Sequence, residues 1–126
     1  MTDQADLLIL IVDDNEQNAK LARDVLRAAG LRTIEAATGA GAVARASRDQ
    51  PDAILLDIRL PDGDGAEFAR RLKADPGTAH IPVIAFTSLA PQDVGEWFQE
   101  AGFDGYVEKP IRVLEFPDEV RHFAGG

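Results

Sequence analysis

Five short runs suited to β-strands alternate along the chain with five stretches of helical periodicity, and this alternation constrains the fold most. The runs cover residues 7–12, 33–37, 53–57, 82–86 and 105–108. The first is continuously apolar, which is typical of a strand buried on both faces of a parallel sheet. Strands that alternate with helices predict an α/β, three-layer doubly wound fold with a five-stranded parallel sheet.

Helical patterns occupy the stretches between these runs. The first follows Asp14 or Asn15, either of which can act as N-cap, and stops at Gly30. The others cover residues 40–48, 66–74, 91–102 and 113–123. Gly95 should weaken the fourth helix by about 1 kcal/mol relative to Ala. Pro117 lies inside the last pattern, so that helix either starts near Pro117 or is kinked there, and we expect a short final helix.

The winding of such a sheet is limited by the right-handedness of its crossovers. The first crossover leads to one edge, and the third strand then returns to the other side of the first. The expected order is 2-1-3-4-5, as in flavodoxin-like folds. Successive connections diverge between strands one and three, and ligands of such sheets bind outside the carboxyl ends of the strands at that point.

Polar side chains end four of the five strands. Asp13 and Asp14 follow the first, Asp57 ends the third, Thr87 and Ser88 end the fourth, and Lys109 ends the fifth. Each residue alone has an ordinary interpretation, such as a helix cap, a turn residue or a solvated lysine. Together, they should converge on one crevice at the carboxyl edge, which strongly favours a shared site.

The chemistry of such a site follows from its charges. Three close carboxylates raise one another's pKa unless cations neutralise them. Lys109 is one such cation, and a set of oxygen ligands suits Mg²⁺ or Mn²⁺ as another. A phosphoryl group on Asp57 would then meet the metal, Lys109 and the Thr87 hydroxyl. We therefore predict that Asp57 is a nucleophile that accepts a phosphoryl group.

Composition bounds the remaining possibilities. The 126 residues fit a single domain, residues 1–126, with a frayed tail at 1–6, and the absence of cysteine excludes disulfides and thiolate sites. A net charge of −9 argues against direct nucleic-acid binding. No apolar run could span a membrane, and no signal-peptide pattern is present. We expect a cytoplasmic protein.

Four stretches of the sequence are similar to a known family. They are Val-Asp-Asp-Asn at 12–15, Leu-Asp-Ile-Arg-Leu-Pro-Asp-Gly at 56–63, Ala-Phe-Thr-Ser at 85–88 and Tyr-Val-Glu-Lys-Pro at 106–110. In content and spacing they resemble the CheY-like receiver domain of two-component response regulators, over nearly the whole chain. That family has the 2-1-3-4-5 order, so the resemblance also implies it.

The resemblance implies a role for each residue of the acidic site. Asp57 would take a phosphoryl group from a phosphohistidine on a histidine kinase or histidine phosphotransfer protein. Asp14 would ligate Mg²⁺ directly and Asp13 through water, with Asp57 and the backbone carbonyl of Arg59 as further ligands. Lys109 would pair with a phosphoryl oxygen.

It also implies how the signal leaves the site. Thr87 would be the switch hydroxyl that moves onto the phosphate, and Tyr106 the aromatic that then rotates inward. The Lys109–Pro110 bond would be cis. The fourth helix, fifth strand and fifth helix would form the output surface for a downstream protein, with a phosphorylation-dependent homodimer as a further possibility. Trp97 is expected in the core, with partner contact as the alternative.

Ser88, Arg59 and Leu89 would form the loops around the phosphate. Arg59 and Leu89 lie two residues beyond Asp57 and Thr87, at positions that influence access of the hydrolytic water. A long side chain and a leucine there predict a shielded acyl phosphate that is lost slowly.

Three alternatives remain open. A phosphohydrolase of the haloacid-dehalogenase kind would carry a second Asp where Arg59 stands, which argues against turnover; we expect self-phosphorylation and dephosphorylation rather than enzymatic activity. A degenerate receiver acting as a scaffold is disfavoured by the complete site. Because the sequence ends at Gly126, soon after the last helix, the chain is either a single-domain regulator or a receiver excised from a hybrid kinase or larger regulator.

Overall fold

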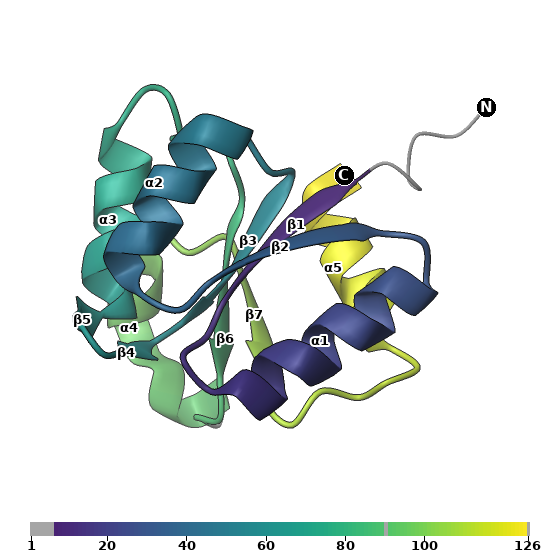
Figure 1. Ribbon diagram of the computed structural model, residues 1–126. Coiled ribbons are helices and arrows are strands. Elements are labelled where there is room, and N and C mark those ends of the chain that lie inside the picture. The colour runs from purple at the N-terminus through teal and green to yellow at the C-terminus, as the bar shows by residue number, and fades with distance from the viewer. Residues whose placement is uncertain (1–6, 90, 126) are drawn as a thin grey trace.

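The computed structural model describes residues 7–89 and 91–125, so the predicted tail at 1–6 lies outside the described part (Figure 1). Strands and helices alternate as expected. In chain order the elements are β1 (Leu8–Val12), α1 (Glu16–Ala28), β2 (Arg32–Ala36), α2 (Gly39–Asp49), β3 (Ala53–Asp57), β4 (Arg59–Leu60), β5 (Gly63–Asp64), α3 (Gly65–Ala74), β6 (Val83–Thr87), α4 (Pro91–Glu100), β7 (Gly105–Glu108) and α5 (Phe116–Gly125).

Five of the strands form one parallel sheet in the order β2-β1-β3-β6-β7. These are strands 2-1-3-4-5 of the predicted sheet, so the predicted fold class and winding are confirmed. The register pairs Val12 with Leu56, and Asp57 with Phe86. Asp13 therefore follows β1 at the level where β3 ends on Asp57, and both lie at the carboxyl edge of the sheet.

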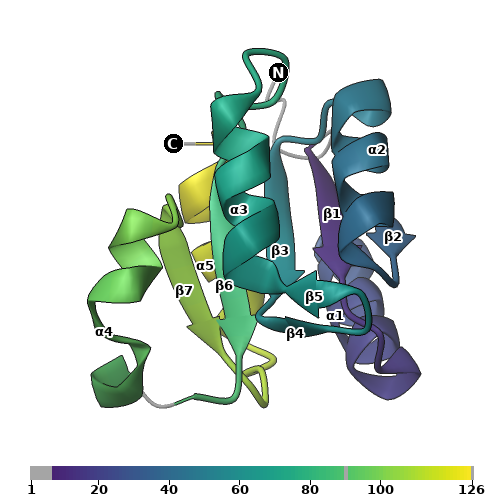
Figure 2. The ribbon, with the colours of Figure 1, turned by 90° about the vertical axis from the view of Figure 1, so that its left-hand side faces the viewer.

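Helices cover both faces of the sheet. Figures 1 and 2 show α2, α3 and α4 on one face and α1 and α5 on the other. Alternate side chains of β1 enter the two cores: Leu10 and Val12 pack on the α2–α3–α4 side, and Ile9 and Ile11 on the α1–α5 side. All four are fully buried, which explains the unbroken apolar run of the first strand.

Local signals in the sequence set several helix ends. The side chain of Asn15 caps α1 by accepting a hydrogen bond from the N–H of Asn18 at 3.0 Å. Gly30, just past the end of α1, has φ +94°, a left-handed conformation that favours glycine. The last helix begins at Phe116, so Pro117 lies in its first turn. The expectation of a short final helix starting near Pro117 is confirmed.

The fourth helix differs from the prediction of a continuous segment. Gly95 interrupts the helical backbone of α4 with φ 68° and ψ −171°, a conformation open essentially to glycine alone. Gly95 is expected only to weaken the fourth helix, but in the structure it interrupts that helix completely. The side chain of Trp97 lies outside the described part of the structure, and its expected place in the core stays a prediction.

A two-stranded hairpin, absent from the prediction, replaces the simple turn expected after Asp57. β4 and β5 pair antiparallel, with Arg59 opposite Asp64 and Leu60 opposite Gly63. Gly65 closes its base: the N–H of Gly65 donates to the carbonyl of Ile58 at 2.6 Å.

Within residues 7–89 and 91–125, no helix is both long enough and apolar enough to cross a membrane.

Candidate functional site

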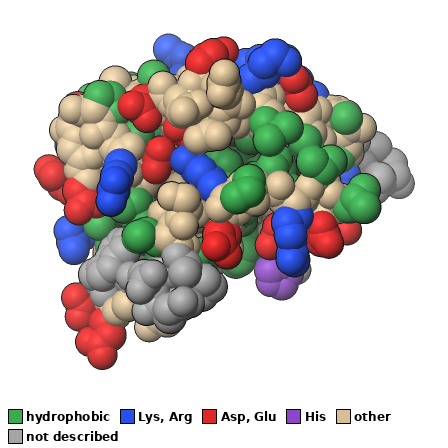
Figure 3. All heavy atoms as spheres, turned by 90° about the horizontal axis from the view of Figure 1, so that it is seen from below, with side chains coloured by type: hydrophobic (Ala, Val, Ile, Leu, Met, Phe, Trp, Pro, Cys, Tyr) green, Lys and Arg blue, Asp and Glu red, His purple; other side chains and the backbone are tan. Residues whose placement is uncertain are grey.

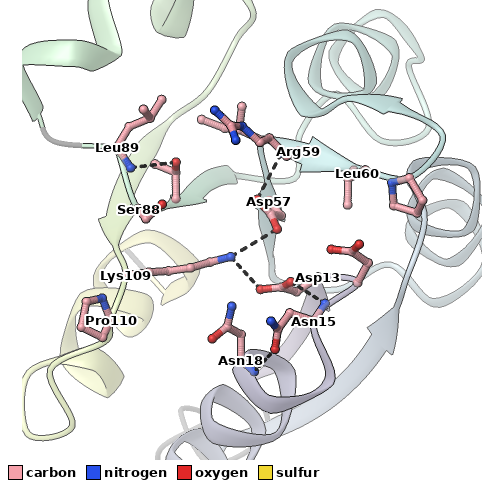
Figure 4. Close-up of a pocket in the computed structure, with 14 residues that line it drawn as sticks. Asp13, Asn15, Asn18, Asp57, Arg59, Leu60, Ser88, Leu89, Lys109 and Pro110 are labelled. Carbon is pink, nitrogen blue, oxygen red and sulfur yellow. Dashed lines mark hydrogen bonds and ion pairs between the residues drawn. The ribbon is translucent and has the colours of Figure 1, made fainter.

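A cavity of about 640 Å³ opens at the carboxyl edge of the sheet (Figure 4). Figure 3 looks onto this edge and shows acidic and basic side chains gathered side by side on it. The strand-end residues predicted from the sequence share this cavity, whereas Tyr106 does not line it. The lining residues are Asp13, Asp14, Asn15, Asn18, Asp57, Ile58, Arg59, Leu60, Pro61, Thr87, Ser88, Leu89, Lys109 and Pro110.

Lys109 joins two of the carboxylates. Its Nζ lies 2.7 Å from Oδ2 of Asp13 and 3.2 Å from Oδ2 of Asp57. The side chains are largely buried, with exposed fractions of 14% for Lys109, 0% for Asp13 and 13% for Asp57. The ammonium also lies 4.7 Å from the centre of the Phe86 ring. Because water screens such buried charges poorly, the ion pairs orient both carboxylates strongly.

The three carboxylates are close enough to share one cation. Asp13, Asp14 and Asp57 each offer an oxygen within 4.8 Å of the others. Asp13 is held in place by the N–H of Asn15, which donates to its Oδ1 at 2.9 Å, whereas Asp14 is exposed. Hard oxygen donors with open positions fit Mg²⁺ or Mn²⁺. One lysine leaves this cluster negative, so the donor set fits a bound divalent cation.

The environment of Asp57 opposes its ionisation. Burial raises the pKa of the Asp57 carboxyl, and the nearby charge of Asp13 adds to this. The Lys109 ammonium and the N–H of Arg59, which donates to Oδ1 of Asp57 at 3.1 Å, lower that pKa and offset part of the rise. A cation bound beside Asp57 would favour its ionised, nucleophilic form.

A chain of hydrogen bonds leads from Thr87 to Tyr106. The buried hydroxyl of Thr87 accepts from the N–H of Leu89 at 3.1 Å. The Tyr106 hydroxyl donates to the carbonyl of the same Leu89, and its ring lies 6.3 Å from that of Phe98. Leu89, in the loop after β6, is thus bonded both to Thr87 in the site and to Tyr106 on β7. The inward rotation implied for Tyr106 stays a prediction.

Two of the remaining predicted residues lie at the rim. Ser88 and Arg59 are exposed, and Leu89 is half-buried.

The Lys109–Pro110 peptide bond is cis. Lys109 is further fixed by its backbone N–H, which donates to the carbonyl of Thr87 at 2.7 Å.

Sequence reasoning missed several residues around this site. Asn18 lines the cavity from the first turn of α1, three residues after the cap at Asn15. Gly65 is tightly constrained, since a Cβ there would lie 2.3 Å from the carbonyl oxygen of Asp57. Asp64 caps α3 by accepting from the N–H of Ala66 at 2.9 Å. The alternation of Asp and Gly at 62–65 was the visible sign of this arrangement.

Comparison with known proteins identifies the architecture. Residues 9–121 match the family described as response regulator receiver domain. The chain is 40% identical over 117 residues to the polar-differentiation response regulator DivK of Brucella ovis, which covers 93% of this chain and 95% of DivK.

Solved structures agree with this assignment. The receiver domain of the sensor histidine kinase PA1611 from Pseudomonas aeruginosa PAO1, solved with a magnesium ion coordinated in its active-site cleft, is 35% identical. It covers 95% of this chain and 98% of its own, with a TM-score of 0.86. The chemotaxis response regulator CheY4 of Vibrio cholerae is 22% identical and shares the fold with a TM-score of 0.86. The match covers 93% of this chain and 98% of CheY4. The chain therefore belongs to the response regulator receiver domains, the CheY-like, phosphorylation-dependent switches of two-component signalling.

Proposed function

We propose that this receiver accepts a phosphoryl group on Asp57 from a phosphohistidine of a histidine kinase or histidine phosphotransfer protein. A Mg²⁺ or Mn²⁺ ion is held by Asp13, Asp14, Asp57 and the backbone carbonyl of Arg59. The observation that carries the proposal is the position of Lys109 Nζ, which contacts Asp13 and Asp57 together in a cavity where three carboxylates approach within 4.8 Å. The magnesium ion in the related receiver of PA1611 supports the same cation here.

The residues of the site divide the reaction between them. An oxygen of Asp57 forms a bond to phosphorus as the phosphorus–nitrogen bond of the phosphohistidine breaks, and the departing imidazole nitrogen keeps that electron pair. The Arg59 N–H, on Oδ1 of Asp57, holds the carboxylate in one orientation. Lys109 starts 3.2 Å from Oδ2 of Asp57 and moves onto a phosphoryl oxygen. The cation, when bound, neutralises charge on the phosphoryl oxygens.

Phosphorylation then changes the hydrogen bonds of Thr87. Its hydroxyl, which accepts from the Leu89 N–H, turns to donate to a phosphoryl oxygen. The backbone of Leu89 shifts with it, and Tyr106, bonded to the Leu89 carbonyl, follows. The surface formed by α4, β7 and α5 is thereby altered for a downstream protein or for a second phosphorylated copy.

The acyl phosphate is expected to be long-lived. The exposed Arg59 and the half-buried Leu89 both line the cavity, so both limit the approach of water. Decay of the ³²P-labelled protein measures this directly. A half-life of a few seconds in the isolated protein would contradict the shielding, and replacement of both residues by Ala should shorten the half-life.

The test of the function is incubation with acetyl phosphate and Mg²⁺ followed by intact mass measurement. The mass should rise by one phosphoryl group, and Asp57→Asn should prevent this. Asp24→Asn is a matched control, because Asp24 is an exposed carboxylate on α1 that pairs with Lys20 and Arg23. Sustained release of phosphate over many turnovers would instead favour a phosphohydrolase.

A further inference from the structure

The tip of the β4–β5 hairpin is bonded to the N-terminus of α2. Oδ1 of Asp62 accepts from the N–H of Gly39 at 2.8 Å, and Oδ2 accepts from the N–H of Ala40 at 2.9 Å. Asp62 lies 23 residues from Gly39 along the chain. The carboxylate thus links a loop of the candidate site to a helix outside it.

These two bonds complete the cap of α2. The Thr38 hydroxyl accepts from the N–H of Gly41 at 2.9 Å, and the Thr38 carbonyl accepts from the N–H of Ala42 at 3.0 Å. The first four amides of the helix therefore all have acceptors, and the hairpin supplies two of them. The first turn of α2 has no acidic residue of its own, so Asp62 provides the negative charge that a helix N-terminus favours. These hydrogen bonds hold the pKa of Asp62 below its ordinary value, so it is ionised at neutral pH.

The anchor itself is closely packed. A Cβ on Gly39 would lie 2.1 Å from the ring of Phe68, so Phe68 of α3 packs directly on the backbone where α2 begins. Phe68 is buried. The N-terminus of α2 is therefore held against α3 by packing, and Asp62 bonds to a fixed point.

The other end of the hairpin reaches the cation site. Only Leu60 and Pro61 separate Asp62 from Arg59, whose N–H donates to Asp57. Packing holds the hairpin at two points: Leu60, only 9% exposed, belongs to the core on the α2–α3–α4 side, and Gly63 lies against the Phe68 ring, where a Cβ would be 3.2 Å away. The other side chains of the hairpin are exposed, including Asp62 at its tip. The two bonds of Asp62 therefore add a polar restraint at the exposed tip to the packing of Leu60 and Gly63, and together they limit how far the backbone at Arg59 can move.

We propose that Asp62 is a positioning residue for the cation site: by tying the hairpin tip to α2, it fixes the backbone of Arg59 beside Asp57. The proposal rests on the proposed function, in which the Arg59 carbonyl is a ligand of the cation. Asp62 itself does not touch the cation or the phosphoryl group.

The experiment is calorimetric titration of the full chain with Mg²⁺, without a phosphodonor, for the parent, Asp62→Ala, Asp62→Asn and Thr38→Ala. Thr38→Ala is the matched control, because it removes a cap of the same helix but leaves the hairpin attached. Urea unfolding of each variant measures the structural effect. Loss of either cap should lower the unfolding midpoint.

The Kd for Mg²⁺ should rise on the order of tenfold in Asp62→Ala, as for other residues that orient metal ligands. It should rise less in Asp62→Asn, whose amide oxygen can accept one of the two bonds. Thr38→Ala should bind Mg²⁺ like the parent. Equal Kd values for parent and Asp62→Ala would overturn the proposal, and so would equal weakening by Thr38→Ala.

Three further outcomes are distinguishable. If Asp62→Ala does not fold, Asp62→Asn decides, and an unchanged Kd in that variant overturns the proposal. If the parent itself binds no Mg²⁺, the proposed function fails and the positioning role with it. If the parent binds Mg²⁺ and the Asp62 variants bind equally well, only the positioning role fails.

Discussion

The ammonium of Lys109, which follows β7 at one side of the sheet, lies 2.7 Å from the carboxylate of Asp13 at the end of β1. Between these strands lie β6 and β3, so the lysine side chain crosses the carboxyl edge of the sheet, over the Phe86 ring. Its long stem allows one cation to reach two acids at once. The site therefore depends on Lys109 for its electrostatic balance before any metal binds.

Replacing Lys109 by Met should destabilise the metal-free protein. The carboxylate of Asp13, whose side chain is 0% exposed, would lose its cation. Leaving a buried charge unpaired costs about 3 kcal/mol in the free energy of unfolding. Urea unfolding in EDTA measures this, and added Mg²⁺ should restore more stability to the variant than it adds to the parent.

Lys20→Met is the control for this change. Lys20 pairs with Asp24 on the surface, where both side chains are more than half exposed, and such pairs contribute about 0–1 kcal/mol. Equal stabilities of the Lys109 and Lys20 variants would contradict the balancing role of Lys109.

Replacing Thr87 by Ala should separate phosphorylation from its output. The variant loses the hydrogen bond to the Leu89 N–H, at a cost of about 1 kcal/mol, and should still accept a phosphoryl group from acetyl phosphate. In the parent, phosphorylation should change the amide hydrogen exchange rates of β7 and of the loop after β6. In Thr87→Ala, phosphorylation should leave these rates unchanged. Thr33→Ala, a buried threonine away from the site, should respond like the parent. A normal exchange response in Thr87→Ala would show that another group carries the signal.

Replacing Gly65 by Ala should disturb the end of β3. The new Cβ would lie 2.3 Å from the carbonyl oxygen of Asp57 and 2.8 Å from Cα of Ile58. Such overpacking against backbone should cost about 2 kcal/mol in unfolding free energy and slow phosphorylation, because Asp57 must shift. Gly125→Ala is the control, since its nearest contact would be an ordinary 3.6 Å to Leu7. If both variants phosphorylate at the parental rate, the fit at Gly65 does not position Asp57.

Stability should depend on pH through Asp62. Its pKa is lowered in the folded protein by the N–H groups of Ala40 and Gly39. A lowered carboxyl pKa stabilises the fold fully above the unfolded value, about 3.9, and this stabilisation is lost as pH falls through the folded value. Asp62→Asn should thus be less stable than the parent at neutral pH, with a difference that shrinks below about pH 4. A difference that stays constant across this range in urea unfolding would show that ionised Asp62 does not stabilise the fold.

The sequence predicts the sheet well because its signals are local. The apolar run at 7–12 and the alternation with helical patterns are readable from neighbouring residues. Handedness then limits the winding, and the resemblance to receiver domains implies the same strand order. The convergence of Asp13, Asp57, Thr87 and Lys109 followed from that winding, since strand ends of a parallel sheet share an edge.

What the sequence did not predict depends on distant partners. The contact of Asp62 with Gly39 spans 23 residues, and the strands of the β4–β5 hairpin are too short for a periodicity to show. Gly95 marks a weak point in the fourth helical pattern, but a glycine there does not by itself distinguish a weakened helix from a broken one. The alternation of Asp and Gly at 62–65 indicates a turn, but it predicts neither the pairing of β4 with β5 nor the partner of Asp62.

The most direct test of the central claim is to locate the phosphoryl group. After incubation with acetyl phosphate and Mg²⁺, borohydride reduction converts an aspartyl phosphate to homoserine, and peptide mass spectrometry identifies the position. Homoserine at position 57 alone, absent when EDTA replaces Mg²⁺, is the predicted result. Homoserine at another aspartate, or an unmodified Asp57 in protein that has gained a phosphoryl group, would contradict it.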